Sequence, residues 1–210
     1  ERILRQRNTL LKNPAARGER SLAKLDPDAA LTLDVWDAKL AETGTALAEA
    51  RASLVRQLEP EVGKAYGEIA STAADVELAY ARSWDGDLAD VVAASRLDYL
   101  RRGLSLVGPH RDDLRVLLGG LPARTHASQG EQRSLALALR LAAHRLVADE
   151  VGETPVLLLD DVFSELDPER CAALLAHLPQ GQALLTTTGA VPPGTAPAVT
   201  VRVTNGRLSV

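Results

Sequence analysis

The chain has 210 residues, of which 46% are hydrophobic, and it carries a formal net charge of −4 at pH 7. This length and composition can bury a sizeable core in more than one lobe, and the net charge excludes a wholly basic nucleic-acid surface, though not a local basic patch. A single cysteine, Cys171, excludes a disulfide framework, and no apolar run approaches 18 residues, so we expect a cytoplasmic protein with no membrane contact.

The first long element carries leucines spaced seven residues apart, at Leu33, Leu40, Leu47 and Leu54. This spacing predicts a helix that packs against another helix, and a short coiled coil and a plain amphipathic core helix explain it equally well. We expect Pro60 to end the helix, because proline removes a backbone donor. Residues 1–12 can supply an antiparallel partner through a turn region at 14–28.

The middle of the chain is less distinctive. Residues 76–80 are expected to add a strand and residues 88–102 a further helix. Two groups of basic residues flank this part of the chain: Arg2, Arg5, Arg7 and Lys12, then Arg101, Arg102 and Arg111. Each group is compatible with a solvated helix face and with contacts to nucleic-acid phosphates, so charge alone does not establish DNA binding.

A long helix is predicted where leucine and alanine recur at helical spacing between Leu135 and Val147. Ser128 stands at its N-cap and Glu131 follows three residues later, which is the capping-box spacing. An ordinary capped helix explains this pair. A serine and glycine at a helix start can also present a hydroxyl, a backbone N–H and the positive end of the helix dipole to a phosphate. Gly130 favours the second interpretation. Glycine weakens a helix, so its presence here is easier to explain if a ligand must approach the backbone closely.

The next element is an apolar run from Pro155 to Leu159 that ends in two adjacent carboxylates, Asp160 and Asp161. The run predicts a buried parallel strand, and open α/β sheets bind ligands at the carboxyl ends of such strands. Asp160 could hold Mg²⁺, and Asp161 could orient or deprotonate an attacking water. The alternative is a simple transition from strand to loop. A tight loop to the next helix is predicted by Asp167 as N-cap and Pro168 at the first helical position.

Near the C-terminus, Asn205-Gly206 is the strongest short hairpin signal in the chain and lies between residues 200–204 and 207–210.

Two features are absent from the sequence. The chain has no methionine, even at its first residue, so we expect it to be part of a longer protein. It also lacks a P-loop of the form G-x-x-x-x-G-K-[ST], and we therefore expect the chain alone to be inactive as an ATPase.

Several ordered motifs together resemble the RecF family of bacterial recombination and repair ATPases, which is of the ABC/SMC-like class. These motifs are S-Q-G-E-Q-R at 128–133, L-L-L-D-D-V-F-S-E-L-D at 157–167, L-L-T-T-T at 184–188, G-P-H-R-D-D at 108–113 and R-Q-R-N-x-L-L-K at 5–12. The resemblance covers the whole chain and implies an α/β fold: a partial ABC/SMC-like nucleotide-sandwich ATPase lobe at residues 104–210, with a helical arm domain at residues 1–103.

The resemblance also implies roles for individual residues. The expected ATP-binding residues are Ser128, Gln129, Gly130, Glu131, Ser164, Asp167 and Thr187. Ser128 and Gly130 would bind the γ-phosphate of ATP held by a partner subunit, Asp160 would hold Mg²⁺, and residues 164–167 would form a loop across the dimer interface. Asp161 would be the catalytic residue, with Glu165 as the next candidate.

Two positions depart from the wider ABC class. Asp161 stands where many relatives in that class have glutamate. The shorter side chain would lie further from the attacking water, so we expect slow hydrolysis. RecF resembles this chain in having aspartate at this position. Threonines at 186–188 stand where a switch histidine is common. A hydroxyl can contact phosphate but cannot change charge near neutral pH.

As function, the resemblance implies a repair protein that binds ATP, forms an ATP-dependent homodimer, and binds single- and double-stranded DNA at gaps together with other recombination mediators. A non-catalytic dimerisation module and another SMC-like repair ATPase are the alternatives. The short arm counts against the SMC-like ATPase.

Overall fold

The structure is a computed structural model and describes residues 1–12, 26–70 and 75–209. The elements in chain order are α1 (Arg2–Lys12), α3 (Pro27–Ala70), β1 (Val76–Ala81), α4 (Leu88–Ala94), α5 (Arg96–Arg102), β2 (Asp113–Leu118), β3 (Leu121–Pro122), α6 (Ala123–His126), α7 (Gln129–Val151), β4 (Leu157–Asp160), η2 (Val162–Glu165), α8 (Pro168–Ala176), β5 (Ala183–Thr186), β6 (Arg202–Thr204) and β7 (Arg207–Ser209). Most of the expected turn region at 14–28 lies outside the described residues.

The described strands form three small sheets, with the orders β1-β2-β3, β4-β5 and β6-β7, so the expected mixed α/β class is confirmed. The chain divides into two compact units, each described here by itself: unit 1 is Glu1–Gln57 with Leu78–Val116, and unit 2 is Leu58–Glu77 with Leu117–Val210. Because α3 supplies residues to both, the compact units alternate along the sequence. The division into an arm at 1–103 and an ATPase lobe at 104–210 therefore stays a prediction.

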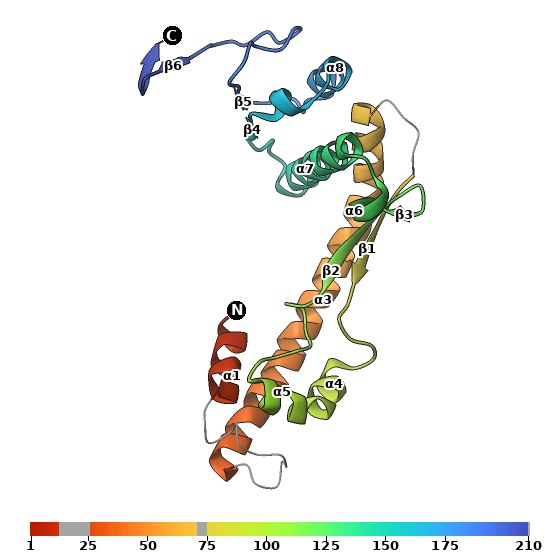
Figure 1. Ribbon diagram of the computed structural model, residues 1–210, viewed down its shortest axis with the longest axis vertical. Coiled ribbons are helices and arrows are strands. Elements are labelled where there is room, and N and C mark those ends of the chain that lie inside the picture. Colours follow the sequence, from red (N-terminus) through yellow and green to blue (C-terminus); the bar gives the residue numbers. More distant parts are fainter. Residues whose placement is uncertain (13–25, 71–74, 210) are drawn as a thin grey trace. The chain divides into compact units, whose positions relative to one another are not determined.

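Unit 1 is built around α1, the first part of α3, and the pair α4 and α5 (Figure 1). Its core is made of apolar side chains from all four helices and from the segment before α4: Leu11, Leu33, Leu40, Ala41, Ala48, Trp84, Leu88, Val92, Tyr99 and Leu100. The single helix expected at 88–102 is instead two short helices. Ser95 separates them, because its backbone departs from helical geometry, with φ −85° and ψ 2°.

Helix α3 corrects two expectations. It does not end at Pro60 but continues to Ala70, because buried side chains beyond the proline, such as Val62 and Ile69, anchor the last turns. The prediction that the leucines spaced seven apart all pack against a neighbouring helix is only half confirmed. Leu33 and Leu40 are buried, whereas Leu47 and Leu54 are 45% and 46% exposed. The buried positions shift by one residue after Leu40. They continue at a spacing of seven residues through Ala41, Ala48, Val55, Val62 and Ile69.

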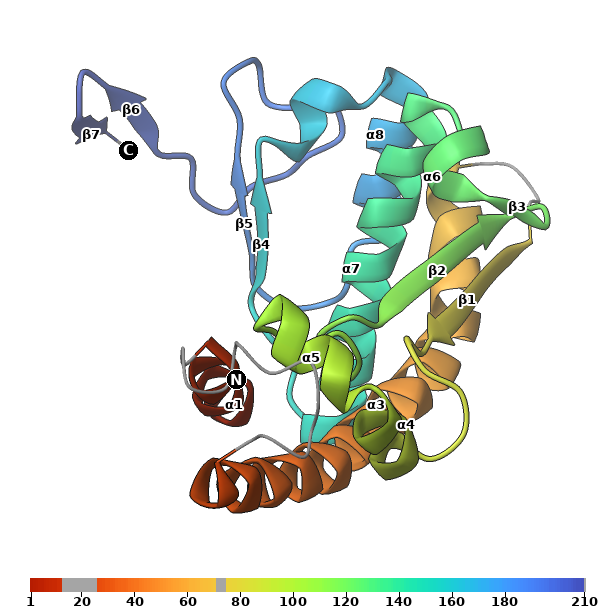
Figure 2. The same ribbon diagram turned by 60° about the horizontal axis from the view of Figure 1, so that its bottom comes forward.

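Unit 2 contains α7, the parallel pair β4 and β5, and α8. One side of α7 is buried through residues at helical spacing: Ser134, Leu135, Ala138, Leu141 and Ala142. Strand β4 is not buried on both faces as expected. Leu157 and Leu159 are buried, but Leu158 is 69% exposed, because β4 and β5 form a sheet of two strands with one covered face (Figure 2). The strand begins at Leu157, two residues later than expected.

The hairpin at the C-terminus is confirmed. Strands β6 and β7 pair antiparallel, with Thr204 opposite Arg207. Asn205 and Gly206 have φ values of 50° and 75°, which is the left-handed backbone that a two-residue turn of this kind needs. Across the described ranges, no helix is both long and apolar enough to cross a bilayer.

Candidate functional site

The start of α7 is a complete capping box. The Ser128 hydroxyl accepts a hydrogen bond from the Glu131 backbone N–H at 3.3 Å, and the Glu131 carboxylate accepts from the Ser128 backbone N–H at 2.7 Å. The same carboxylate also accepts from the Ser128 hydroxyl at 2.7 Å. These bonds to Ser128, first from its side chain and then from its backbone, lower the pKa of Glu131. The predicted N-cap is therefore confirmed, and Ser128 remains exposed at the helix start.

Gly130 has a close neighbour, and that neighbour belongs to the protein. A Cβ at this position would lie 2.6 Å from a terminal nitrogen of Arg170. Arg170 in turn pairs with the Asp167 carboxylate at 2.9 Å, and Asp167 caps α8 by accepting from the Arg170 backbone N–H at 2.9 Å. The hydrogen bond from that backbone N–H lowers the pKa of Asp167. Arg170 thus joins the 128–131 motif to the 164–167 segment, which sequence spacing could not show.

The paired carboxylates lie at the carboxyl end of β4, as expected. Asp160 is opposite Thr186 in the parallel register with β5, and the Thr186 hydroxyl donates a hydrogen bond to Asp160 Oδ1. The same hydroxyl accepts from the backbone N–H of Asp161 at 3.0 Å. One threonine on the neighbouring strand therefore holds both members of the pair.

Asp161 has an unusual backbone, with φ 48° and ψ 27°. A left-handed conformation costs a residue with a Cβ on the order of 1 kcal/mol, although Asp and Asn tolerate it better than most. It turns the chain sharply from β4 into η2, and the Ser164 hydroxyl closes this turn by donating to the Asp161 carbonyl at 2.8 Å. Asp161 Oδ1 accepts from the Thr188 backbone N–H and hydroxyl, each at 3.4 Å.

The three threonines make different contacts in the structure, and the expected contact of Thr187 with the nucleotide stays a prediction. Thr186 and Thr188 contact the two aspartates, whereas the hydroxyl of Thr187 accepts from the Gly189 backbone N–H at 3.2 Å. The register of β5 beside β4 decides this, because residues directly opposite each other have neighbouring side chains. Neither Thr186 nor Thr188 was predicted from sequence to contact the aspartates, although pairing the two apolar runs would have placed Thr186 beside Asp160. Gln129 is the exposed first residue of α7.

A hollow of about 400 Å³ adjoins the carboxylates within unit 2. Its walls come from one side of α7, from the end of β4 and from the following turn: Arg133, Ala136, Leu137, Arg140, Asp160, Asp161, Val162 and Leu166. Within the described part of the chain, no three His, Cys, Asp or Glu side chains gather into a metal cluster. A cation at Asp160 would need further oxygen ligands, and Mg²⁺ commonly takes one or two carboxylates plus phosphate oxygens. The donor set thus suits a magnesium–nucleotide complex better than a free ion.

Comparison with known proteins identifies the fold. No family model matches the sequence. Among solved structures, the recombination mediator protein RecF-ATP of the RecFOR pathway matches with a TM-score of 0.80 and 29% identity, over 99% of this chain and 55% of that chain. RecF-ATPrS of the same pathway matches with a TM-score of 0.73 and 31% identity, over 90% of this chain and 51% of that chain. The chain spans about half the length of these relatives. The resemblance expected from the sequence motifs is confirmed, and this protein is RecF-like over nearly its whole described length.

Proposed function

We propose that this chain is the part of a RecF-like recombination mediator that closes an ATP site across a homodimer. The observation that carries the proposal is found in unit 2, where the exposed N-terminus of α7 is joined through Arg170 to the cap of α8. Both ends are of the kind that bind phosphate, because the first backbone N–H groups of a helix are unpaired and its dipole is positive there. The solved relatives carry ATP or ATPrS in their names.

In this proposal the two halves of the site have different tasks. Ser128, Gln129, Gly130 and Glu131, with Ser164 and Asp167, contact ATP that is held by the P-loop of the partner subunit. A phosphate at the start of α7 would compete with Glu131 for the Ser128 hydroxyl, since that hydroxyl donates to the Glu131 carboxylate in the free chain. Closure of the dimer would then require Ser128 to exchange Glu131 for phosphate.

The aspartates act on the nucleotide of their own subunit. Asp160 would hold Mg²⁺, which shields the charge of the phosphates. Asp161 would orient the attacking water and accept its proton, and its bonds to Thr188 fix the direction of the carboxylate. Its short side chain supports slow turnover. Thr187, expected from sequence to contact the nucleotide, stays part of the proposal as a neighbour of Thr186 and Thr188.

The rest of the proposal concerns the whole protein. It binds single- and double-stranded DNA at gaps, acts with other recombination mediators, and works in the cytoplasm. The relatives support the recombination role, because both are described as recombination mediator proteins of the RecFOR pathway. A P-loop in the remainder of the protein is required.

The test is Ser128→Arg in the full-length protein, with ATP-dependent dimerisation measured by light scattering. We expect dimerisation to be lost and ATP binding by the monomer to persist, because the arginine obstructs the surface that meets the partner, while loss of the Ser128 cap lowers the stability of the fold by only about 1 kcal/mol. Thr32→Arg is the matched control, since it adds the same charge at an exposed position of α3 in unit 1. Dimers that persist in Ser128→Arg would overturn the assignment. ATP-driven dimers of the wild-type protein without turnover would instead favour a non-catalytic dimerisation module.

A further inference from the structure

The basic residues near the N-terminus separate into two kinds in the structure. Arg7 is fully buried, whereas Arg2, Arg5 and Lys12 are exposed on α1. The three exposed cations follow one another at spacings of three and seven residues, so they share one face of the helix. Among the residues the structure describes, none of the three forms an ion pair.

Two of the three charges, Arg2 and Arg5, do not stabilise the helix itself, whereas Lys12 lies in the last turn, where a cation is favourable. The first turn of α1 contains no acidic residue, and Arg2 and Arg5 stand near its N-terminus. Cations there oppose the helix dipole, and like charges three residues apart repel each other. An arrangement that weakens the isolated helix is better explained by an external anion than by helix stability.

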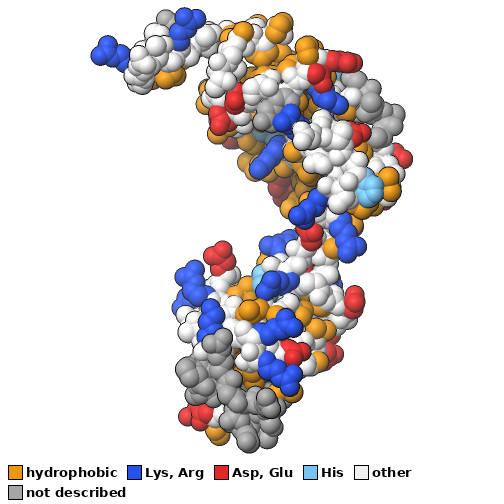
Figure 3. Space-filling view, in the orientation of Figure 1, with side chains coloured by type: hydrophobic (Ala, Val, Ile, Leu, Met, Phe, Trp, Pro, Cys, Tyr) orange, Lys and Arg blue, Asp and Glu red, His pale blue; other side chains and the backbone are white. Residues whose placement is uncertain are grey.

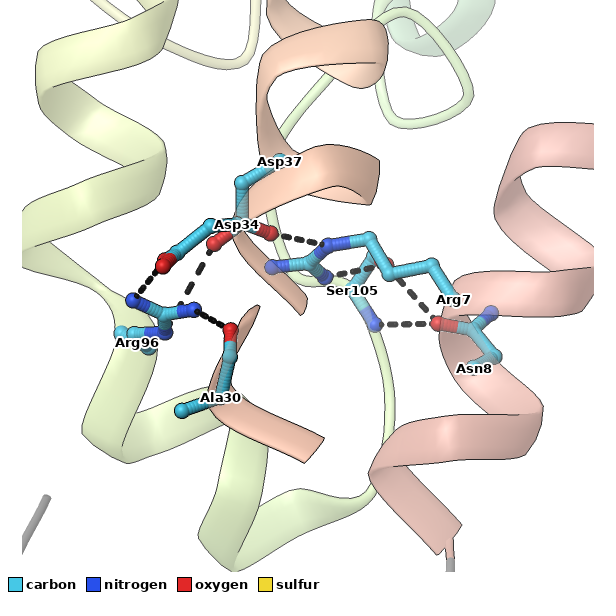
Figure 4. A network of polar contacts seen from close by, with 7 residues as sticks. All are labelled: Arg7, Asn8, Ala30, Asp34, Asp37, Arg96 and Ser105. Atoms are coloured by element: carbon cyan, nitrogen blue, oxygen red, sulfur yellow. Dashed lines mark hydrogen bonds and ion pairs between the residues drawn. The ribbon is translucent and has the colours of Figure 1, made fainter. Parts of the chain in front are cut away.

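Arg7 explains how this face is fixed in place. Its Nε pairs with Asp37 of α3 at 2.7 Å, and one of its terminal nitrogens donates to the Ser105 hydroxyl at 2.7 Å (Figure 4). Its guanidinium also lies 4.4 Å from the centre of the Tyr99 ring. The side chain of Asn8 accepts from both the backbone N–H and the hydroxyl of Ser105. Helix α1 is thus fastened to α3 and to the segment after α5.

The second basic group, Arg101, Arg102 and Arg111, belongs to the segments that α1 contacts. Arg101 and Arg102 end α5, which packs against α1. Arg111 lies in a tight turn in which its backbone N–H donates to the Gly108 carbonyl at 2.8 Å. The neighbouring His110 donates to the Ser105 carbonyl at 3.1 Å, so the turn is connected to the residue that holds Arg7 and Asn8.

Two acidic side chains near this surface are engaged in contacts with the protein itself. Asp112 is drawn toward the protein by the Tyr80 hydroxyl and the Ser83 backbone N–H, and Asp98 pairs with Arg101 at 3.4 Å. Figure 3 shows basic side chains gathered over the part of unit 1 that holds α1 and α5 in Figure 1. The six cations of the two basic groups outnumber the acidic residues beside them in the sequence, Glu1, Asp98, Asp112 and Asp113, so the local charge is opposite to the net charge of the whole chain, −4.

We infer that these six residues, Arg2, Arg5, Lys12, Arg101, Arg102 and Arg111, form a phosphate-binding surface for duplex DNA, which we name the basic face. The inference rests on the DNA-binding part of the proposed function and assigns residues to it. From Arg2 to Lys12 the helix spans about 15 Å, which matches about four phosphates along one strand of duplex DNA.

The composition of unit 1 favours duplex over single-stranded DNA. Binding of single strands commonly uses exposed aromatic rings on which bases stack. Trp84 and Tyr99 are buried, and Trp36 and Tyr80 are half-buried, so no aromatic side chain described in unit 1 is fully exposed for stacking. Backbone contacts by arginine and lysine carry no sequence information, and binding should be independent of sequence and sensitive to salt.

The test compares two triple variants of the full-length protein that lose the same charge. Arg2→Gln/Arg5→Gln/Lys12→Gln removes the α1 part of the basic face, and Arg56→Gln/Lys64→Gln/Arg115→Gln removes three exposed cations elsewhere. Binding of a labelled duplex of about 30 base pairs is followed by fluorescence anisotropy from roughly 50 to 200 mM salt. The basic-face variant should bind roughly 10-fold more weakly or worse, with a salt slope shallower by about 2 to 3. A single strand of equal length should bind more weakly than duplex to the wild-type protein.

Each contrary result has a separate meaning. Equal losses in both variants would assign the effect to net charge and overturn the basic face. Wild-type affinity in the basic-face variant would overturn it as well, while DNA binding by the protein would stand. A single strand that binds more tightly than duplex would overturn the choice of duplex. If the wild-type protein bound no DNA, the DNA part of the proposed function would fail. ATP-dependent dimerisation, measured on the same samples, should stay unchanged because it depends on residues of unit 2.

Discussion

Thr186 donates a hydrogen bond from its hydroxyl to the carboxylate of Asp160 on the neighbouring strand. The same oxygen accepts from the backbone N–H of Asp161, which also donates to the Thr186 carbonyl at 3.2 Å. Because the donated bond fixes the rotation of the Asp160 carboxylate and the accepted bond holds the turn after it, Thr186 is a positioning residue for both acidic side chains.

We expect Thr186→Val to lower the free energy of unfolding by about 1 kcal/mol, the usual contribution of one hydrogen bond. Valine suits the strand and has nearly the same shape, so the change isolates the hydroxyl. The affinity for Mg²⁺–ATP should fall in the full-length protein, because Asp160 would rotate freely, and Thr186→Ser should restore it. Thr195→Val is the control, since that hydroxyl donates to the Pro192 carbonyl and contacts neither aspartate. Magnesium titration of ATP binding decides, and a Thr186→Val protein with wild-type affinity would contradict the positioning role.

The two aspartates should respond differently to loss of charge. Asp160→Asn should weaken Mg²⁺-dependent ATP binding, because an amide keeps an oxygen ligand but loses the charge that attracts the cation. Asp161→Asn should preserve ATP binding and dimerisation while slowing hydrolysis by roughly 10²-fold or more, as expected for removal of a positioned general base.

Asparagine is a suitable substitute at position 161, because it tolerates the left-handed backbone that Asp161 adopts there. ATP turnover, dimerisation and the thermal midpoint should be measured on both variants. If folded Asp161→Asn hydrolysed ATP at the wild-type rate, the catalytic role would move elsewhere, with Glu165 the next residue to test.

Local features of the fold were predictable from sequence, and features that depend on distant segments were not. The caps at Ser128 and Asp167 and the hairpin at Asn205-Gly206 depend on residues within three positions, and all three are confirmed. The end of α3 was mispredicted because packing of later residues outweighs the local effect of Pro60.

In the candidate site, too, contacts between segments far apart in the sequence were not predictable. The motifs indicated Asp160, Asp161, Ser128 and the threonines at 186–188, but not the contacts between the threonines and the aspartates, because those contacts depend on the register between β4 and β5. Arg170 was missed for a similar reason. Its approach to Gly130 depends on how α7 and α8 lie in unit 2, which no sequence spacing encodes.

His110 should make stability depend on pH. Burial lowers its pKa from the ordinary value of about 6.5. The folded state then binds fewer protons than the unfolded state, so the stability from neutral His110 is full above about pH 6.5 and is lost as pH falls toward the folded pKa. His110→Gln should flatten this part of the curve while keeping a donor for the Ser105 carbonyl. Urea unfolding between about pH 5 and pH 8 provides the measurement, with His126→Gln, a histidine of α6 whose ring contacts Thr125 and the Pro122 carbonyl, as control. Parallel curves for wild type and His110→Gln would contradict it.

The buried pair Arg7–Asp37 should show strong coupling in a double-mutant cycle. Arg7→Met leaves the Asp37 carboxylate near the core with only the more distant Arg96, at 3.7 Å, and we expect a loss of about 3 to 5 kcal/mol, typical of breaking a buried pair. Arg7→Met/Asp37→Leu removes both charges and should recover much of that loss, because the cost lies in the unpaired charge.

The pH dependence of Arg7→Met gives an independent check on this pair. Burial already raises the pKa of Asp37, and Arg7 opposes the rise, so removing Arg7 raises the folded pKa further. A raised pKa means that the folded state binds more protons, and stability is then lost as pH rises from about 3.9 through the folded pKa. The defect of Arg7→Met should therefore be smaller near pH 3 than at pH 7. Chemical unfolding of the wild type, Arg7→Met, Asp37→Leu and the double variant at both pH values measures this, and additive single effects with no change between the two pH values would show that Arg7 and Asp37 act independently.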